Sequence, residues 1–256
     1  APRYQGAGSS LVNPTELTTA LEAIGASSLT MASYAQGFTR TGGADARLTA
    51  EAVAAASSAQ VALVYLGLDE TAESEGNDRT HLHLAAHQVE LLTAVRAVAQ
   101  RVVVVLSAGS VVEMPWLDQV DALVHGYLGG QAGAGATVDV LTGTVNPSGR
   151  LAETYPLRLE DTASHGYYPG TQETAEYREG IYVGYRHTET AGVPTLFPFG
   201  FGLGYTTFAY ADLVVDDAGA TFTVENTGAV AGAEVAQLYV GRRGPSGVHR
   251  AARELK

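Results

Sequence analysis

Five acidic side chains lie close together, directly after an apolar run. The run occupies residues 61–66, and the acids that follow are Asp69, Glu70, Glu73, Glu75 and Asp78. Carboxyl groups at the end of a buried strand are the material for general acid and base catalysis. A solvated loop that caps the next helix would explain any one of these acids. The cluster as a whole favours a functional site, because neighbouring like charges raise each other's pKa and are costly without a use.

Other candidate sites in the sequence are weaker. His81, His83 and His87 resemble a metal set, but on a strand followed by a helix their spacing does not bring them together, and no HExxH pattern is present. The glycines of residues 129–135 do not complete a dinucleotide fingerprint, so they favour tight turns and helix packing. No GxSxG elbow occurs. The sequence therefore predicts no metal and no cofactor.

Strands and helices alternate through the first two-thirds of the chain, joined by short Gly-rich segments. The run 101–106 is β-branched and unbroken by polar residues, which is typical of a parallel strand buried on both faces. We expect an α/β layer whose mostly parallel sheet is flanked by helices, with ligands at the carboxyl ends of the strands. Strands are predicted at 28–35, 61–66, 101–106 and 122–125, and helices at 14–24, 48–58, 84–99 and 132–141.

After about residue 206 the pattern changes to strands of alternating apolar and polar residues. These strands are expected at 208–215, 220–225 and 234–240, separated by Asp-Asp-Ala-Gly and Asn-Thr-Gly-Ala turns. They indicate the start of an antiparallel β-sandwich, with too few strands to close two sheets. Two aromatic, Gly-spaced stretches lie before it, at 177–186 and 197–205, and we expect them to pack rather than to bind sugars.

Composition excludes several classes of function. The 46% hydrophobic and 16% charged content fits a packed protein, and no apolar stretch is long enough for a membrane span. The net charge of −12 argues against a nucleic-acid partner. Without cysteine, disulfides and thiolate metal sites are absent. The N-terminus carries no signal segment, which leaves localisation open between secreted and bacterial cytoplasmic, with secretion slightly favoured.

The order of these segments resembles the C-terminal part of glycoside hydrolase family 3, the β-glucosidase and β-xylosidase family. The stretches that carry the resemblance are GLDETAESEGNDR with Gln88 on the following helix, VVVVLSAGSVVEMPW, GYLGGQAGAGATVDVLTGTVNPSGRLAETYP, YREGIYVGYR, LFPFGFGLGYTTF and VENTGAVAGAEVAQLYV. The match covers nearly the whole chain, and NPSGRL with PFGFGLGYT is its most specific part.

The resemblance implies a three-part enzyme: a barrel with the Asp nucleophile, an α/β sandwich with the acid/base glutamate, and a fibronectin type III-like domain. We therefore expect residues 1–206 to form the sandwich and residues 207–256 an incomplete fibronectin type III-like domain. Both ends look cut, and we expect a barrel-domain chain or another fragment of the same enzyme as partner. A truncated relic is the less favoured alternative.

The resemblance also implies roles for the acidic residues. Glu73 is expected to be the acid/base, with Glu70 and Glu75 as competitors, because the length of this loop varies in the family. An Asp78–Arg79 ion pair is expected to brace the loop, and Asp69 to form a turn.

A second loop, residues 5–10, matches one that reaches the aglycone subsite with an aromatic residue in some relatives. This chain has Ser9 and Ser10 there, so they are weak candidates for substrate binding.

The implied activity is hydrolysis of a β-linked glucoside, or another glycoside, by double displacement with retention. The alternative is a non-catalytic carbohydrate-binding or interaction module that keeps the fold.

Overall fold

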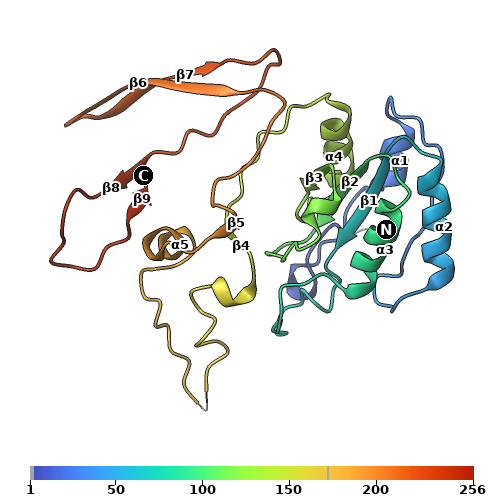
Figure 1. Cartoon of the computed structure of the whole chain (residues 1–256), viewed down its shortest axis with the longest axis horizontal. Helices are drawn as coiled ribbons and strands as arrows, with labels where there is room; N and C mark the ends of the chain where they lie inside the picture. The colour runs from blue at the N-terminus through green and yellow to red at the C-terminus, as the bar shows by residue number, and fades with distance from the viewer. Residues whose placement is uncertain (1–2, 172) are drawn as a thin grey trace. The chain divides into compact units, whose positions relative to one another are not determined.

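The computed structural model describes residues 3–171 and 173–256 and divides the chain into two compact units (Figure 1). The first unit ends at Thr142 and the second begins at Gly143. The domain boundary expected after residue 206 lies inside the second unit and stays a prediction.

A three-stranded parallel sheet forms the centre of the first unit, as predicted. Its strands are β1 (Ala62–Gly67), β2 (Val102–Ser107) and β3 (Ala122–His125), in the order β1-β2-β3. The central strand is the most buried, and Val102, Val104 and Leu106 have no exposed surface. A β-branched run without polar residues suits this position, because both faces of a central parallel strand are covered.

Four α-helices accompany the sheet, in two contacting pairs (Figure 1). The helix α2 (Ala46–Ser57) contacts α3 (Ala86–Arg96), and α1 (Ala20–Gly25) contacts α4 (Gly133–Thr142). Short 3-10 turns lie at Gly8–Ser10, Leu117–Gln119 and Gly130–Ala132. The alternation of strands and helices confirms the α/β class.

In the first unit, the predicted helix over 14–24 and the predicted strand over 28–35 differ from the structure. The helix expected over 14–24 begins only after Thr19, whose hydroxyl accepts from the Glu22 N–H while the Glu22 carboxylate accepts from the Thr19 N–H. This capping box fixes the start of the helix locally. The strand expected over 28–35 was wrong, because this segment is exposed and pairs with no strand of the described chain. A strand requires a neighbour for its hydrogen bonds.

In its described residues, 143–171 and 173–256, the second unit contains three small antiparallel sheets. They pair β4 (Tyr155–Pro156) with β5 (Thr195–Phe197), β6 (Phe208–Asp216) with β7 (Gly219–Asn226), and β8 (Tyr239–Gly241) with β9 (Arg253–Leu255). The remaining elements are the helix α5 (Tyr185–Ala191) and a 3-10 turn at Leu159–Asp161. Of the strand expected over 234–240, only the last two residues are in a strand, at the start of β8.

Local sequence explains the hairpin of β6 and β7. One carboxylate oxygen of Asp216 accepts from the backbone N–H groups of Ala218 and Gly219. This is the turn chemistry expected of an Asp at this position. The predicted Asp-Asp-Ala-Gly turn is confirmed.

The aromatic stretches pack within the second unit. Phe197 stacks on Phe201 with ring centroids 4.9 Å apart, and Tyr185 stacks on Phe199 at 5.1 Å. Such pairs stabilise a fold beyond the area they bury. In the described part of the chain, no helix is long and apolar enough to cross a membrane.

Candidate active site

The register of the parallel sheet brings three loops to one edge of the first unit. Gly67 at the end of β1 is opposite Ser107 at the end of β2, and Leu106 of β2 is opposite His125 at the end of β3. The segments that follow the three strands therefore start side by side. Ligands of open α/β sheets bind at such an edge.

Asp69 shapes the start of the acidic loop, as expected. One of its carboxylate oxygens accepts hydrogen bonds from the backbone N–H groups of Thr71 and Ala72, each at 2.8 Å. Its carbonyl accepts from the N–H of Glu73 at 3.2 Å. This turn directs Glu73 toward the loop that follows β2.

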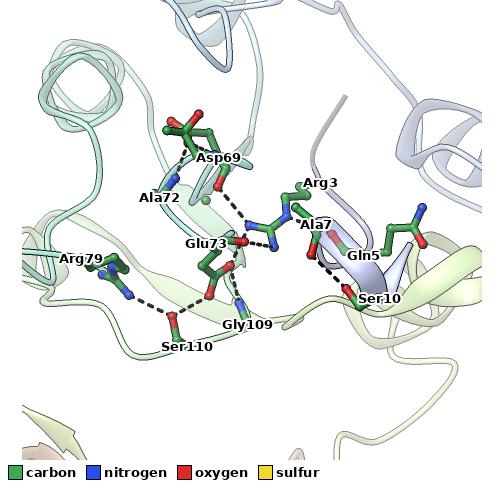
Figure 2. A network of polar contacts seen from close by, with 12 residues as sticks. Arg3, Gln5, Ala7, Ser10, Asp69, Ala72, Glu73, Arg79, Gly109 and Ser110 are labelled. Carbon is green, nitrogen blue, oxygen red and sulfur yellow. Dashed lines mark hydrogen bonds and ion pairs between the residues drawn. The ribbon is translucent and has the colours of Figure 1, made fainter. Parts of the chain in front are cut away.

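The carboxylate of Glu73 lies at the centre of a polar network (Figure 2). Its Oε2 accepts from Arg3 Nη1 at 2.8 Å and from the Gly109 N–H at 3.0 Å, and its Oε1 accepts from Ser110 Oγ at 2.5 Å. The side chain is only 10% exposed. Both oxygens of the expected acid/base are thus engaged by the protein.

The partner of Glu73 comes from the beginning of the described chain. The Arg3 side chain is 4% exposed, and it also donates to the carbonyls of Gln5, Asp69 and Glu73. The carbonyl of the next residue, Tyr4, accepts from the Gly130 N–H at 2.8 Å. These bonds fasten the segment that leads to Ser9 along the same edge of the sheet.

Ser9 and Glu75 meet in this arrangement. Oε2 of Glu75 accepts from the Ser9 hydroxyl at 2.6 Å and from the Ser9 N–H at 3.1 Å. Both residues are exposed, and no residue of the described chain hydrogen-bonds Oε1 of Glu75. The bonds from the Ser9 hydroxyl and then from its N–H lower the pKa of the Glu75 carboxyl. Ser10 instead donates its hydroxyl to the Ala7 carbonyl.

Glu70, the third candidate, points to a different partner. Its Oε1 lies 2.6 Å from Arg40 Nη2 in a partly exposed ion pair. Such pairs contribute little to stability when both side chains reach solvent. Glu70 therefore has a different partner from Glu75 and does not take part in the Ser9–Glu75 contact.

Arg79 braces the loop through contacts that the sequence did not indicate. Its Nη1 donates to Ser110 Oγ at 2.9 Å (Figure 2). The same Nη1 donates to the Val111 carbonyl at 3.0 Å. Ser110 in turn donates to Glu73, so the acidic loop is fastened to the loop after β2 twice. An ion pair between Arg79 and Asp78 stays a prediction.

Two further residues at this edge escaped the sequence reasoning. His125 ends β3, and its ring stacks on Tyr127 with centroids 3.8 Å apart. Burial lowers the pKa of the His125 imidazole, opposed by its hydrogen bond to the Leu106 carbonyl and by the charge of Glu73. The only sequence signal was a polar aromatic residue at a strand end.

Of the three histidines near the loop, His81 and His83 lie together, and His87 has a different ring neighbour. His83 lies 3.3 Å from a carboxylate oxygen of Glu113 and stacks on His81, whereas His87 lies beside the ring of Phe38. Within the described ranges, no group of three His, Cys, Asp or Glu side chains is placed to hold a metal ion.

Comparison with known proteins identifies relatives along the whole chain. The thermostable β-glucosidase B of Acetivibrio thermocellus is 46% identical over all of this chain and 35% of its own length. An exo-α-(1→6)-L-arabinopyranosidase of Bifidobacterium breve is 43% identical over all of this chain and 34% of its own length. The chain thus spans about a third of the length of these curated relatives.

Solved structures agree with the sequence relatives. The Bifidobacterium adolescentis family 3 β-glucosidase superposes with a TM-score of 0.94 at 45% identity, covering 99% of this chain and 38% of the other. DesR, a β-glucosidase from Streptomyces venezuelae solved with D-glucose, gives 0.76 at 40% identity, covering 82% of this chain and 27% of the other. The glycosyl hydrolase family 3 C-terminal domain matches residues 1–205. The chain belongs to this family.

Proposed function

We propose that this chain is the acid/base-bearing part of a retaining β-glycosidase, with β-glucosides as the first substrates to test. The observation that carries the proposal is Glu75, an exposed carboxylate at the carboxyl end of the sheet. Ser9 holds one of its oxygens, and no residue of the described chain hydrogen-bonds the other. Membership of family 3 supports the reaction class. The Asp nucleophile would come from a barrel domain outside this chain.

Two carboxyl groups are required for this chemistry. In retaining glycosidases they lie about 5–5.5 Å apart, and one attacks the anomeric carbon while the other protonates the leaving oxygen. The second group then removes a proton from the water that hydrolyses the glycosyl-enzyme. A loop at a sheet edge can present this second group to a neighbouring domain.

Accessibility favours Glu75 over Glu73 as this second group. A proton donor has to approach the glycosidic oxygen to hydrogen-bond distance. The Glu73 side chain is 10% exposed and uses both oxygens for Arg3, Gly109 and Ser110, whereas Glu75 is exposed and no residue of the described chain hydrogen-bonds its Oε1. Assignment of the role to Glu73, which the family resemblance suggested first, stays a prediction. Glu70 is the weaker alternative, because Arg40 holds its Oε1 and its Oε2 is buried.

Azide rescue distinguishes the two glutamates. In Glu75→Ala of the barrel-containing enzyme, we expect turnover of alkyl glucosides to fall by about 10²–10⁴-fold, which is the usual contribution of general acid-base catalysis. Dinitrophenyl glucoside needs no proton donor, so its glycosyl-enzyme should form and react with azide to give the β-glucosyl azide. Glu73→Ala should give no azide product. The reverse result would make Glu73 the acid/base.

The sugar accepted is a separate question. The names of the relatives include β-glucosidases and an exo-α-(1→6)-L-arabinopyranosidase, at similar identity to this chain. A panel of nitrophenyl glycosides that includes β-D-glucoside, β-D-xyloside, N-acetyl-β-D-glucosaminide and α-L-arabinopyranoside tests this part of the proposal. We expect the highest kcat/KM for the β-D-glucoside.

A non-catalytic sugar-binding or interaction module is the alternative function. Mass spectrometry of the natural protein separates the two, because the enzyme requires a barrel on the same polypeptide or on a co-purifying fragment. Glucoside binding by a protein without any barrel would support the module.

A further inference from the structure

We propose that Glu73 is a positioning residue that sets the place of Glu75 by fastening the acidic loop to the segment carrying Ser9. The inference rests on the proposed function, in which Glu75 is the acid/base. Its basis is that the same two segments are joined twice: Arg3 binds Glu73, and Ser9 binds Glu75. The first contact is buried and the second is exposed.

Two segments distant in sequence converge on the Glu73 carboxylate. Arg3 reaches it from 70 residues away, and Ser110 from 37 residues away. Hydrogen bonds to an ionised group are shorter and stronger than neutral ones, so a carboxylate with three donors holds its neighbours firmly. The structure thus places a rigid anchor two residues before Glu75.

The surroundings leave Glu73 little freedom to move. A Cβ added at Gly109 would lie 3.2 Å from Oε1 of Glu73 and 3.0 Å from Cδ1 of Leu128. The glycine therefore permits a close approach of backbone to carboxylate. Arg79 holds Ser110 from the other side, which fixes the hydroxyl that Glu73 accepts.

The negative charge of Glu73 is required to balance the positive charge of the buried Arg3 side chain. Arg3 is buried, and the other acceptors of its guanidinium are the neutral carbonyls of Gln5, Asp69 and Glu73. Loss of the Glu73 charge would leave the Arg3 charge buried without compensation, which is strongly unfavourable. The segment would then move to expose Arg3, and Ser9 would be drawn away from Glu75.

A displaced acid affects the reaction selectively. A misplacement of about 1 Å can cost about 10²-fold in rate. Formation of the glycosyl-enzyme, which kcat/KM reports, depends on the proton donor for glycosides with poor leaving groups but not for dinitrophenyl glucoside. Hydrolysis of the glycosyl-enzyme uses the same group as a base for both substrates. A residue that merely supports folding would lower the turnover of both substrates together.

The test uses Glu73→Gln in the barrel-containing enzyme. We expect kcat/KM for an alkyl glucoside to fall by about 10²-fold while kcat/KM for dinitrophenyl glucoside, which reports formation of the glycosyl-enzyme, stays within about threefold. Ser110→Ala, which removes only one of the three bonds, should give a smaller loss with the same leaving-group dependence. The Ser110→Ala variant tests the same inference if Glu73→Gln does not fold. Glu51→Gln is the matched control, because Glu51 forms an exposed ion pair with Arg47 on α2.

Equal losses for both substrates, or no loss in either variant, would overturn the inference while the azide result for Glu75 stands. An azide product from Glu73→Gln would overturn it as well, because Glu73 would then be the proton donor itself. Absence of an azide product from Glu75→Ala would instead contradict the proposed function, so the two failures are distinguishable.

Discussion

The Ser9 hydroxyl lies 2.6 Å from Oε2 of Glu75, and the Ser9 N–H lies 3.1 Å from the same oxygen. Both bonds favour the ionised carboxylate, which lowers the pKa of Glu75. Ser9 therefore contacts the proposed acid/base directly, although it lacks the aromatic side chain that some relatives have in this loop.

Replacement of Ser9 by Ala should shift the pH profile of the barrel-containing enzyme. Loss of the hydroxyl donor raises the pKa of Glu75, so the protonated acid persists to higher pH. The alkaline limb of kcat/KM should move upward, whereas Ser57→Ala, an exposed serine of α2, should leave it unchanged. A limb that stays in place or moves downward in Ser9→Ala contradicts the assignment.

The same bond links folding stability to pH. The folded pKa of Glu75 is depressed, so its contribution is present above the unfolded pKa and is lost as the pH falls through the folded value. In Ser9→Ala this acid dependence should weaken, which unfolding midpoints at a series of pH values measure.

Gln88 on α3 acts as a substitute strand neighbour for the end of β1. Its side-chain amide accepts from the Gly67 N–H and donates to the Gly67 carbonyl, each at 2.9 Å, and the residue is 2% exposed. Gln88→Met keeps the size of the side chain and removes both bonds.

We expect Gln88→Met to lower the free energy of unfolding of the first unit by about 2–4 kcal/mol, because each unsatisfied polar group costs about 1–3 kcal/mol. The Gly67 amide should also exchange its hydrogen faster. Glu90→Met, at an exposed position of the same helix, is the control and should change stability by no more than about 0.5 kcal/mol. Unchanged exchange at Gly67 would show that water replaces Gln88.

Local sequence predicted the elements that carry their own signal. The run 102–107 forms the buried central strand because its first four side chains are β-branched valines and the fifth is an apolar leucine. Segments 28–35 and 234–238 have a strand-like pattern but no ladder in the described chain, since a ladder depends on a partner that local sequence does not specify.

The site was predicted to a similar depth. The sequence placed the acids at a strand end, which is confirmed, whereas its expectation that the Ser9 loop lies beside the substrate stays a prediction. It did not separate Glu73 from Glu75, because the buried partners Arg3 and Ser110 lie 70 and 37 residues away. His125 was missed, because a lone histidine at a strand end has no distinctive pattern.

A substitution at Gly109 tests whether the close approach of its backbone to the Glu73 carboxylate is required, because an added methyl group would fill the space between them. An added Cβ would lie 3.2 Å from Glu73 Oε1 and 3.0 Å from Leu128 Cδ1. Leu128 can rotate, but three donors hold Glu73, so the carboxylate or the loop would have to shift.

Gly109→Ala should therefore destabilise the first unit by about 1–3 kcal/mol, the usual cost of overpacking. The backbone N–H is retained, so the loss comes from displacement rather than from a missing donor. Turnover of alkyl glucosides by the barrel-containing enzyme should fall more than that of dinitrophenyl glucoside. Gly135→Ala provides the comparison, because an added Cβ there meets nothing within 4 Å, and alanine in α4 should stabilise the helix by up to about 1 kcal/mol. Wild-type stability and turnover in Gly109→Ala would mean that the loop adjusts without moving Glu73, and that the glycine is not needed for the approach.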